Sequence, residues 1–252
     1  MRVVVSMTTI PSRVSKIRPM LESVLAQTRK PDRTVLWLPP YCLKEHTPYD
    51  IPADLKRWMI INDIEVSNCG CDWGSATKLI PTLFSEDDGE TVLITLDDDV
   101  AYEPHAVEEL VTASEKWPDV SLGFMGGVAG PAFVHAEALA MQGQDRGEVD
   151  ILGGYRGILY RRRMFDWSIV EDLNELLNEG PFVVDDQLFG MNLRWRGISR
   201  FVIRTMYPNP NNTLNFKFLN LGHGIYDEGN SKLAEDSLRR LEALYARKGW
   251  KL

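Results

Sequence analysis

The first half of the chain alternates short runs of β-branched apolar residues with segments whose apolar residues recur at helical spacing. The runs at residues 2–8, Thr34–Leu38 and Thr91–Leu96 are continuously apolar, which is typical of buried strands. A shorter strand is expected at Met59–Ile61, and Ile17–Leu25 places its apolar residues on one helical face. This alternating order predicts an α/β fold in which helices flank a central sheet.

The second half of the sequence is less regular. Val120–Phe124 and Gly157–Tyr160 have the composition of strands, and a long glycine-rich stretch separates them. A loop of that length inside a compact domain is usually functional or mobile. A final amphipathic helix is expected over about residues 231–248. No repeat or linker interrupts the sequence, so we expect one domain over residues 1–252.

Composition and charge argue against several classes of function. A net charge of -8 gives general nucleic-acid binding no electrostatic support, so no nucleic-acid partner is expected. No apolar run approaches the roughly 20 residues that span a bilayer, and the run after Met1-Arg2 is too short for a signal peptide. The three cysteines, an odd number, fit a reducing compartment better than a disulfide framework. We therefore expect a cytoplasmic protein without a membrane span.

The strand at Thr91–Leu96 runs directly into three aspartates, Asp97, Asp98 and Asp99. Adjacent carboxylates that are partly buried repel one another by on the order of a few kcal/mol, so a cation must compensate them. Mg²⁺ or Mn²⁺ is the natural candidate, because both prefer oxygen ligands and leave coordination positions open for phosphate. In open α/β sheets, ligands bind at the carboxyl ends of strands. These points favour a metal-assisted ligand site over a solvated turn.

A second pair of carboxylates, Asp185 and Asp186, follows Phe182–Val184 at the start of a predicted helix. Aspartate is favoured at helix starts, where it caps free backbone N–H groups. Capping needs a single side-chain oxygen, so one member of the pair remains available as a general base. We expect that member to be Asp186.

Five segments carry a resemblance to a known family. In chain order they are Ser6–Arg13, Asp72–Leu79, Asp97–Tyr102, Gly154–Arg161 and Asp185–Asp186. Over residues 3 to about 200 the sequence resembles family-2-like glycosyltransferases of the GT-A fold, including bacterial and large-virus members. The resemblance implies a Rossmann-like mixed central β-sheet flanked by helices in a single domain, with a nucleotide-binding half at 1–100 and an acceptor-binding half at 101–252. It also implies transfer from a UDP-, GDP- or dTDP-sugar donor to a hydroxyl of a glycan or glycoconjugate acceptor.

The resemblance also implies roles for individual positions. The donor-binding residues would be Thr8, Thr9, Ile10, Pro11, Arg13, Asp72, Trp73, Lys78, Asp97 and Asp98. Asp99 would bind the metal that bridges the diphosphate, and His223, which lies between two glycines, is a candidate additional ligand. Gly154–Tyr155 would lie under the acceptor sugar. Asp186 would be the catalytic base, with support from Asp185.

Sugar transfer requires the two kinds of group that these roles supply. A bound Mn²⁺ or Mg²⁺ neutralises the charge that grows on the leaving diphosphate. A carboxylate accepts the proton of the attacking hydroxyl. Because a single base acting on that hydroxyl implies direct displacement, we expect inversion at the sugar carbon.

Two other functions are compatible with aspartates at a strand end. A sugar-phosphate nucleotidyltransferase would normally carry a glycine-rich phosphate loop after the first strand, where this chain has Thr8–Arg13 without a glycine. The second alternative is a non-catalytic nucleotide-sugar or glycan-binding module of the same fold. The presence of Asp97, Asp99 and Asp186 argues against it. Release of pyrophosphate from a nucleoside triphosphate and a sugar phosphate would favour the first alternative. Tight binding without turnover would favour the second.

Overall fold

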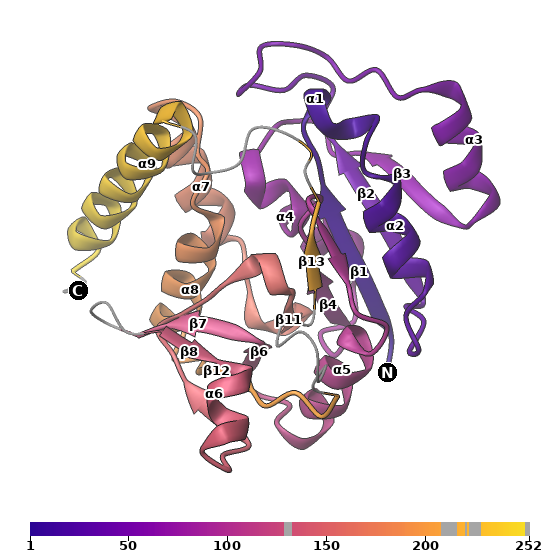
Figure 1. Ribbon diagram of the computed structural model, residues 1–252. Helices are drawn as coiled ribbons and strands as arrows, with labels where there is room; N and C mark the ends of the chain where they lie inside the picture. Colours follow the sequence, from indigo (N-terminus) through magenta and orange to yellow (C-terminus); the bar gives the residue numbers. More distant parts are fainter. Residues whose placement is uncertain (129–132, 208–215, 220, 222–227, 250–252) are drawn as a thin grey trace.

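An eight-stranded mixed sheet forms the centre of the molecule (Figure 1). In sheet order its strands are β3 (Ile64–Asn68), β2 (Arg33–Leu38), β1 (Val3–Thr8), β4 (Val92–Thr95), β11 (Ile158–Arg161), β6 (Ser121–Gly123), β12 (Arg200–Ile203) and β9 (Arg146–Glu148). The structure is a computed structural model that describes residues 1–128, 133–207, 216–219, 221 and 228–249. Strands from both halves of the chain therefore contribute to one sheet.

The four strands β3, β2, β1 and β4 are parallel and contain the point at which the strand order reverses. β1 pairs with β2 on one side and with β4 on the other. The chain thus winds away from β1 in two directions, which leaves a crevice at the carboxyl ends of β1 and β4. β11 pairs antiparallel with β4, so a strand from the second half continues the sheet beside this crevice.

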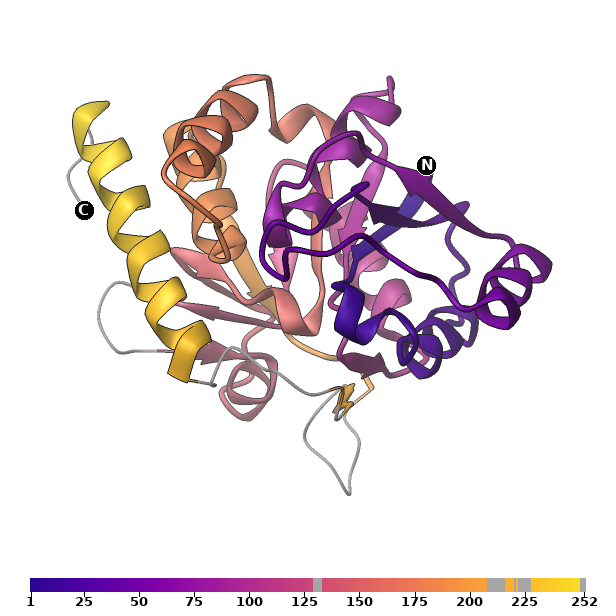
Figure 2. The ribbon, with the colours of Figure 1, turned by 90° about the horizontal axis from the view of Figure 1, so that it is seen from above.

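Helices cover both faces of the sheet, as predicted, and α3 and α9 lie at opposite ends of the molecule (Figures 1 and 2). The α-helices are α1 (Pro11–Val14), α2 (Arg18–Leu25), α3 (Ala53–Ile61), α4 (Ile80–Ser85), α5 (Ala106–Lys116), α6 (Ala136–Met141), α7 (Ser168–Asn178), α8 (Asp185–Trp195) and α9 (Glu228–Arg247). Short 3₁₀ helices are η1 (Gly74–Lys78), η2 (Gly154–Arg156) and η3 (Arg162–Met164). Within the described ranges, no helix combines the length and apolar character that a bilayer span requires.

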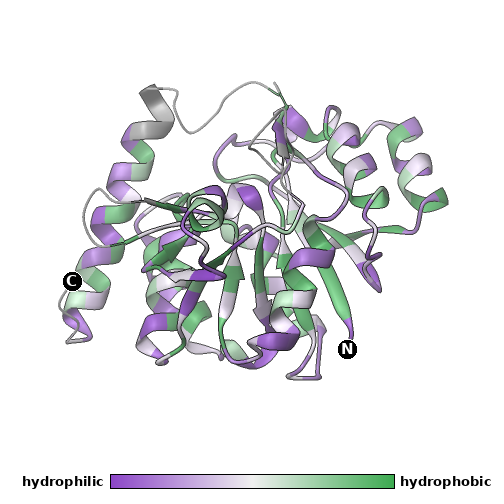
Figure 3. Cartoon of the chain, turned by 60° about the horizontal axis from the view of Figure 1, so that its bottom comes forward, coloured by the Kyte–Doolittle hydropathy of each residue, from purple (hydrophilic) through white to green (hydrophobic). Residues whose placement is uncertain are grey.

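Two hydrophobic clusters, one on each face of the sheet, form the core. Successive residues of a strand point to opposite faces, so Val3 and Val5 of β1 belong to the cluster that contains residues of α2 and α5. Val4 belongs to the cluster that contains residues of α4, α7 and α8. The strands are accordingly hydrophobic along most of their length (Figure 3). This two-sided burial explains the continuous apolar runs in the sequence.

Two smaller sheets lie beside the central one. The first contains β10 (Ile151–Leu152), β7 (Met125–Gly127) and β8 (Phe133–His135), and the second pairs β13 (Phe216–Phe218) with β5 (Val100–Tyr102). β5 follows the three aspartates, and the N–H of Leu219, just after β13, donates to the Asp99 carbonyl at 2.7 Å. A segment from the C-terminal part of the chain is thereby held next to the acidic triplet (Figure 1).

The structure corrects the sequence prediction at one strand. Met59–Ile61, expected as a strand, forms the last turn of α3. Met59 is buried one turn after the buried Leu55, whereas Ile60 and Ile61 are 66% and 72% exposed. The helical spacing of the two buried residues therefore outweighs the β-propensity of the isoleucines.

The glycine-rich stretch after β6 is more regular than the sequence suggests, because its described part contains β7, α6, β9 and β10. Gly126 shows why glycine is needed there. A Cβ at this position would lie 2.6 Å from the carbonyl oxygen of Ile151, so β10 passes too close for any side chain. The predicted C-terminal helix is confirmed as α9.

Candidate active site

A cavity of about 890 Å³ opens at the carboxyl ends of β1 and β4. Most of the predicted site residues line it, namely Thr8, Thr9, Ile10, Arg13, Asp72, Lys78, Asp97, Asp98, Asp99, Tyr155, Asp185 and Asp186. Two predicted donor-binding residues do not line it. Pro11 is the first residue of α1, and Trp73 packs against the hydrophobic core. His223 lies outside the described residues. The folded chain thus brings the two predicted groups of carboxylates to a single cavity.

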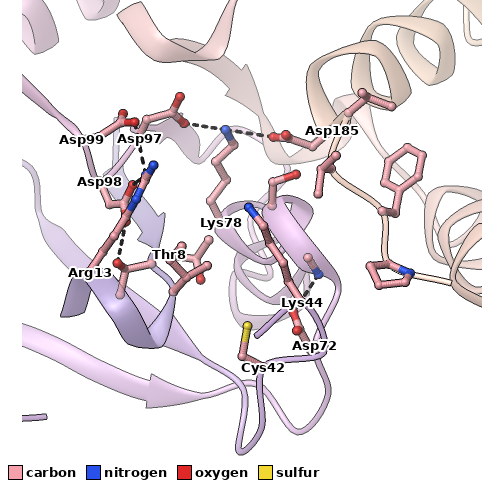
Figure 4. A pocket seen from close by; sticks show the side chains of 18 of the residues that line it. Thr8, Arg13, Cys42, Lys44, Asp72, Lys78, Asp97, Asp98, Asp99 and Asp185 are labelled. Atoms are coloured by element: carbon pink, nitrogen blue, oxygen red, sulfur yellow. Dashed lines mark hydrogen bonds and ion pairs between the residues drawn. The ribbon is translucent and has the colours of Figure 1, made fainter. Parts of the chain in front are cut away.

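The acidic triplet is held by Thr9 and Arg13 from the loop after β1. The Thr9 hydroxyl donates to Asp98 Oδ2 at 2.5 Å. Arg13 Nη1 lies 2.8 Å from Asp98 Oδ1 and 3.2 Å from Asp99 Oδ2 (Figure 4). Burial raises the pKa of Asp98, and the neighbouring Arg13 charge opposes this rise. Burial also raises the pKa of Asp99, and the negative charge of Asp97 raises it further.

Lys78 connects the triplet with the second pair of carboxylates. Its amino group lies 2.6 Å from Asp97 Oδ1 and 2.9 Å from Asp185 Oδ2 (Figure 4). Burial alone would lower the pKa of Lys78, but the charges of Asp185 and Asp97 raise it well above its ordinary value. The Ser6 hydroxyl donates to the Lys78 carbonyl at 2.5 Å and fixes the backbone of this residue. Lys78 is therefore a permanently charged link between the two halves of the site.

These contacts already place positive charge beside the acidic triplet. Three adjacent carboxylates need a compensating cation, and the chain itself supplies Arg13 and Lys78. Within the described residues, no three His, Cys, Asp or Glu side chains are grouped so that they could hold a metal ion. Asp99, whose side chain is 29% exposed, remains open to the cavity. The residues therefore fit a cation shared with ligand oxygens, as Mg²⁺ commonly is, rather than one enclosed by protein alone.

Asp186 lies at the start of α8 and is held differently from the other aspartates. The helix begins after Val184, whose side chain makes no capping hydrogen bond, so neither Asp185 nor Asp186 occupies the capping position. The Gly154 N–H donates to Asp186 Oδ2 at 2.7 Å. Asp186 Oδ1 is buried and has no hydrogen-bond partner within the described residues. Two causes raise the pKa of Asp186 to about 7. Burial is the larger, and the negative charge of Asp185 is the second.

Gly154 has a different place from the one that the sequence analysis gave it. It does not line the cavity but lies behind the Asp186 carboxylate. A Cβ at Gly154 would lie 2.5 Å from Asp186 Oδ1, so the carboxylate can occupy this position only beside a glycine. The structure therefore makes Gly154 a support of Asp186. Tyr155 does line the cavity, and its ring stacks on Phe218 at 5.6 Å between centroids.

Asp72 is a cavity residue whose two carboxylate oxygens already have partners. The N–H of Leu43 donates to Oδ2 and the N–H of Gly74 donates to Oδ1, both at 2.7 Å. Gly74 has a φ of +60°, and a Cβ there would collide with the Phe182 carbonyl. Asp72 therefore joins the turn before η1 to the loop after β2.

Part of the cavity wall comes from a loop that the sequence did not predict as part of the site. Cys42, Leu43, Lys44 and Tyr49, all from the loop after β2, line the cavity. Their segment contains several prolines and shows no periodic pattern, so no local signal in the sequence marks it as part of a site. The rule that ligands bind at the carboxyl ends of strands also applies to this loop, because β2 is the parallel neighbour of β1.

Comparisons with known proteins support the fold. No protein-family model and no curated protein matches the sequence. Among solved structures, a chain of S. aureus TarS matches, in a crystal structure of TarS 1–349 in complex with UDP-GlcNAc. The identity is 15%, the TM-score is 0.57, and the match covers 98% of this chain and 66% of the TarS chain.

A second S. aureus TarS structure matches at 14% identity with a TM-score of 0.56, and covers 98% of this chain and 39% of that chain. The present chain thus spans less than two thirds of either TarS chain. The likeness establishes the same α/β fold, with a central sheet flanked by helices, as the resemblance in the sequence predicted.

Proposed function

We propose that the chain is a glycosyltransferase that transfers a sugar from a nucleoside-diphosphate sugar to a hydroxyl of a glycan or glycoconjugate. The observation that carries this proposal is the meeting of two kinds of aspartate in one cavity. Asp97–Asp99 are paired with basic side chains, while the carboxylate of Asp186 has no basic partner at ion-pair distance in the described chain. The first kind suits the binding of a charged donor, and the second suits the acceptance of a proton.

The donor would bind over the carboxyl ends of β1 and β4, where ligands of open α/β sheets bind. A UDP-sugar is the first candidate, because the TarS structure of the same fold contains UDP-GlcNAc. The described cavity wall contains six aspartates but only three basic residues, namely Asp72, Asp97, Asp98, Asp99, Asp185 and Asp186 against Arg13, Lys44 and Lys78. A diphosphate entering this wall would need further positive charge. That need supports a Mn²⁺ or Mg²⁺ ion shared between Asp99 and the diphosphate.

Such a divalent ion would stabilise the negative charge that develops on the leaving diphosphate. Lys78, held between Asp97 and Asp185, would add a fixed positive charge at the same place. The acceptor would bind beside Tyr155 and the 57% exposed Phe218, which form an aromatic surface suited to a sugar ring.

Asp186 would remove the proton from the attacking acceptor hydroxyl. The new bond forms between the acceptor oxygen and the anomeric carbon, and the bond from that carbon to the diphosphate oxygen breaks. Because Asp186 would act on the hydroxyl itself and would form no bond to the sugar, the displacement is direct and inverts the anomeric configuration. Asp185 would support the reaction indirectly, since its charge helps to keep Asp186 basic.

Incubation with UDP-, GDP- and dTDP-sugars in the presence of Mn²⁺ tests the proposal. We expect release of the nucleoside diphosphate from at least one donor, and a product of inverted configuration by NMR once an acceptor is found. Pyrophosphate release from a nucleoside triphosphate and a sugar phosphate would instead identify a nucleotidyltransferase. Tight binding of a nucleotide sugar without hydrolysis or transfer would identify a binding module.

A further inference from the structure

The three basic residues of the described cavity wall differ in their partners. Arg13 pairs with Asp98 and Asp99, and Lys78 pairs with Asp97 and Asp185, so both are committed to aspartates. Lys44 forms no ion pair with any carboxylate in the part of the chain that the structure describes, although it lines the same cavity. An incoming anion can therefore pair with Lys44 without breaking a protein ion pair.

Lys44 lies on a turn that is anchored at both ends. The Cys42 N–H donates to the Thr47 carbonyl at 2.9 Å, which closes the turn. The Leu43 N–H is bound by Asp72 at 2.7 Å. Hydrogen bonds on either side of Lys44 therefore fix the direction in which its side chain leaves the backbone.

The nearest acidic neighbour in sequence, Glu45, is already engaged elsewhere. Its carboxylate accepts the Ser12 N–H at 2.9 Å and also the Ser12 hydroxyl, at the start of α1. Tyr49 adds a further tie, because its hydroxyl donates to the Thr9 carbonyl at 2.9 Å. The turn is thus bound to the loop after β1, whose residues hold the acidic triplet, and Glu45 forms no ion pair with Lys44 in the described part of the chain.

The surroundings of Lys44 favour an anionic partner. The residue is partly buried, and this burial lowers its pKa. The positive charge of Arg13 lowers the pKa further. Figure 4 shows its amino group pointing into the cavity and away from Asp72. A partly buried ammonium without an ion-pair partner is costly, and an anion near Lys44 and Arg13 would offset both the burial and the mutual repulsion.

We propose that Lys44 binds a phosphate group of the nucleotide donor. Lysine suits this role because its ammonium acts as a point charge toward phosphate oxygens. The assignment rests on the proposed function, since it takes the donor to be a nucleoside diphosphate. It adds a basic residue from the loop after β2 to a donor site that otherwise comes from β1, η1 and β4.

The test compares ligands that differ only in phosphate. UDP, GDP and dTDP are titrated into the wild type by calorimetry with Mn²⁺ present, and the tightest ligand is then compared with its monophosphate and its nucleoside. The same three ligands are titrated into Lys44→Met, into Lys44→Arg, and into Lys56→Met as a control. Lys56 is exposed on α3 and does not line the cavity, so its replacement makes the same change in net charge away from the site.

We expect Lys44→Met to weaken the diphosphate by about tenfold or more, the usual size for a hydrogen bond to a charged group. The loss should be smaller for the monophosphate and absent for the nucleoside, while Lys44→Arg should retain most of the affinity. Lys56→Met should bind all three ligands as the wild type does. An equal loss for all three ligands, or no loss, would overturn the role of Lys44 while leaving the proposed function intact. A wild type that binds no nucleoside diphosphate would overturn both.

Discussion

The aspartates that reach the cavity from the two halves of the chain differ in how their charge is compensated. Each aspartate of the triplet after β4 lies beside a basic side chain, Arg13 or Lys78. Asp186, at the start of α8, receives one hydrogen bond from the Gly154 N–H, and its Oδ1 has no partner among the residues described. The triplet lies beside fixed positive charges, whereas Asp186 can exchange a proton near neutral pH.

This difference separates binding from chemistry within one cavity. A carboxylate paired with arginine or lysine is stabilised in its ionised form, so it suits the binding of cations and polar ligand groups. A carboxylate buried without a cation has a raised pKa and is a candidate general base. Variants of the two groups should therefore affect different steps, and the expected effects below run from the largest to the smallest.

Asp186→Asn should lower turnover by about 10²–10⁴-fold, the range typical of a lost general base. Donor affinity should stay unchanged, because the triplet and its basic partners are intact. Steady-state kinetics and calorimetry measure the two quantities. Asp54→Asn, an exposed aspartate on α3, is the matched control and should behave as the wild type. Turnover near the wild-type level in Asp186→Asn would remove Asp186 from this role.

Gly154→Ala should reduce turnover by about 10²-fold, since a small displacement of a catalytic group can cost that much. The added Cβ would lie 2.5 Å from Asp186 Oδ1 and would force the carboxylate to move. The neighbouring Gly153 offers a control, because a Cβ there would meet its nearest atom at 3.5 Å, an ordinary contact. If Gly153→Ala and Gly154→Ala lose turnover equally, the loop as a whole is responsible and the support of Asp186 by Gly154 is not specific.

The pH dependence of turnover should report the same carboxylate. Asp186 must be ionised to accept a proton, and burial raises its pKa to about 7. At saturating donor, kcat should therefore rise with pH through about 7 and level off above it. At about pH 6, kcat should be about tenfold lower than on this plateau. A profile that is flat between about pH 5.5 and 8 would contradict the assignment.

Stability should respond in the opposite direction to turnover. A carboxyl with a raised pKa holds its proton more tightly in the folded state, so the wild type loses stability as pH rises from the ordinary aspartate pKa of about 4 to the raised pKa of about 7, and keeps this lower stability above it. Asp186→Asn lacks this penalty, and its melting temperature at about pH 8 should be higher, by about 2–4 °C per kcal/mol regained. At about pH 5 the difference should shrink. Thermal unfolding at both pH values checks the sign, and a variant less stable than wild type at high pH would contradict it.

The parallel half of the fold and the acidic triplet could be predicted from the sequence, because both depend on local signals. Continuous apolar runs mark strands buried on two faces, and Asp97–Asp99 follow one such run directly. The ion pairs could not be predicted in the same way. Arg13 and Asp98 are 85 residues apart, and only the folded sheet brings the ends of β1 and β4 together.

Other features stayed hidden because their cause is tertiary. Gly154 looks like an acceptor-side glycine in the sequence, but its contact with Asp186 spans 32 residues. Lys44 lies in a loop without periodicity, and its lack of a carboxylate partner can be seen only when the positions of Asp72 and Glu45 are known. Sequence patterns report burial and local geometry, whereas the pairing of charges depends on the finished fold.

The most direct test of the central claim is a calorimetric titration of UDP, GDP and dTDP into the wild type and Asp99→Ala, with Mn²⁺ and with EDTA. We predict that one nucleotide binds the wild type with Mn²⁺, and that EDTA or the loss of Asp99 weakens this binding by about tenfold or more, equivalent to at least ~1.4 kcal/mol. Undiminished binding by Asp99→Ala would contradict the metal assignment. No binding of any nucleotide would contradict a donor site at the carboxyl ends of β1 and β4.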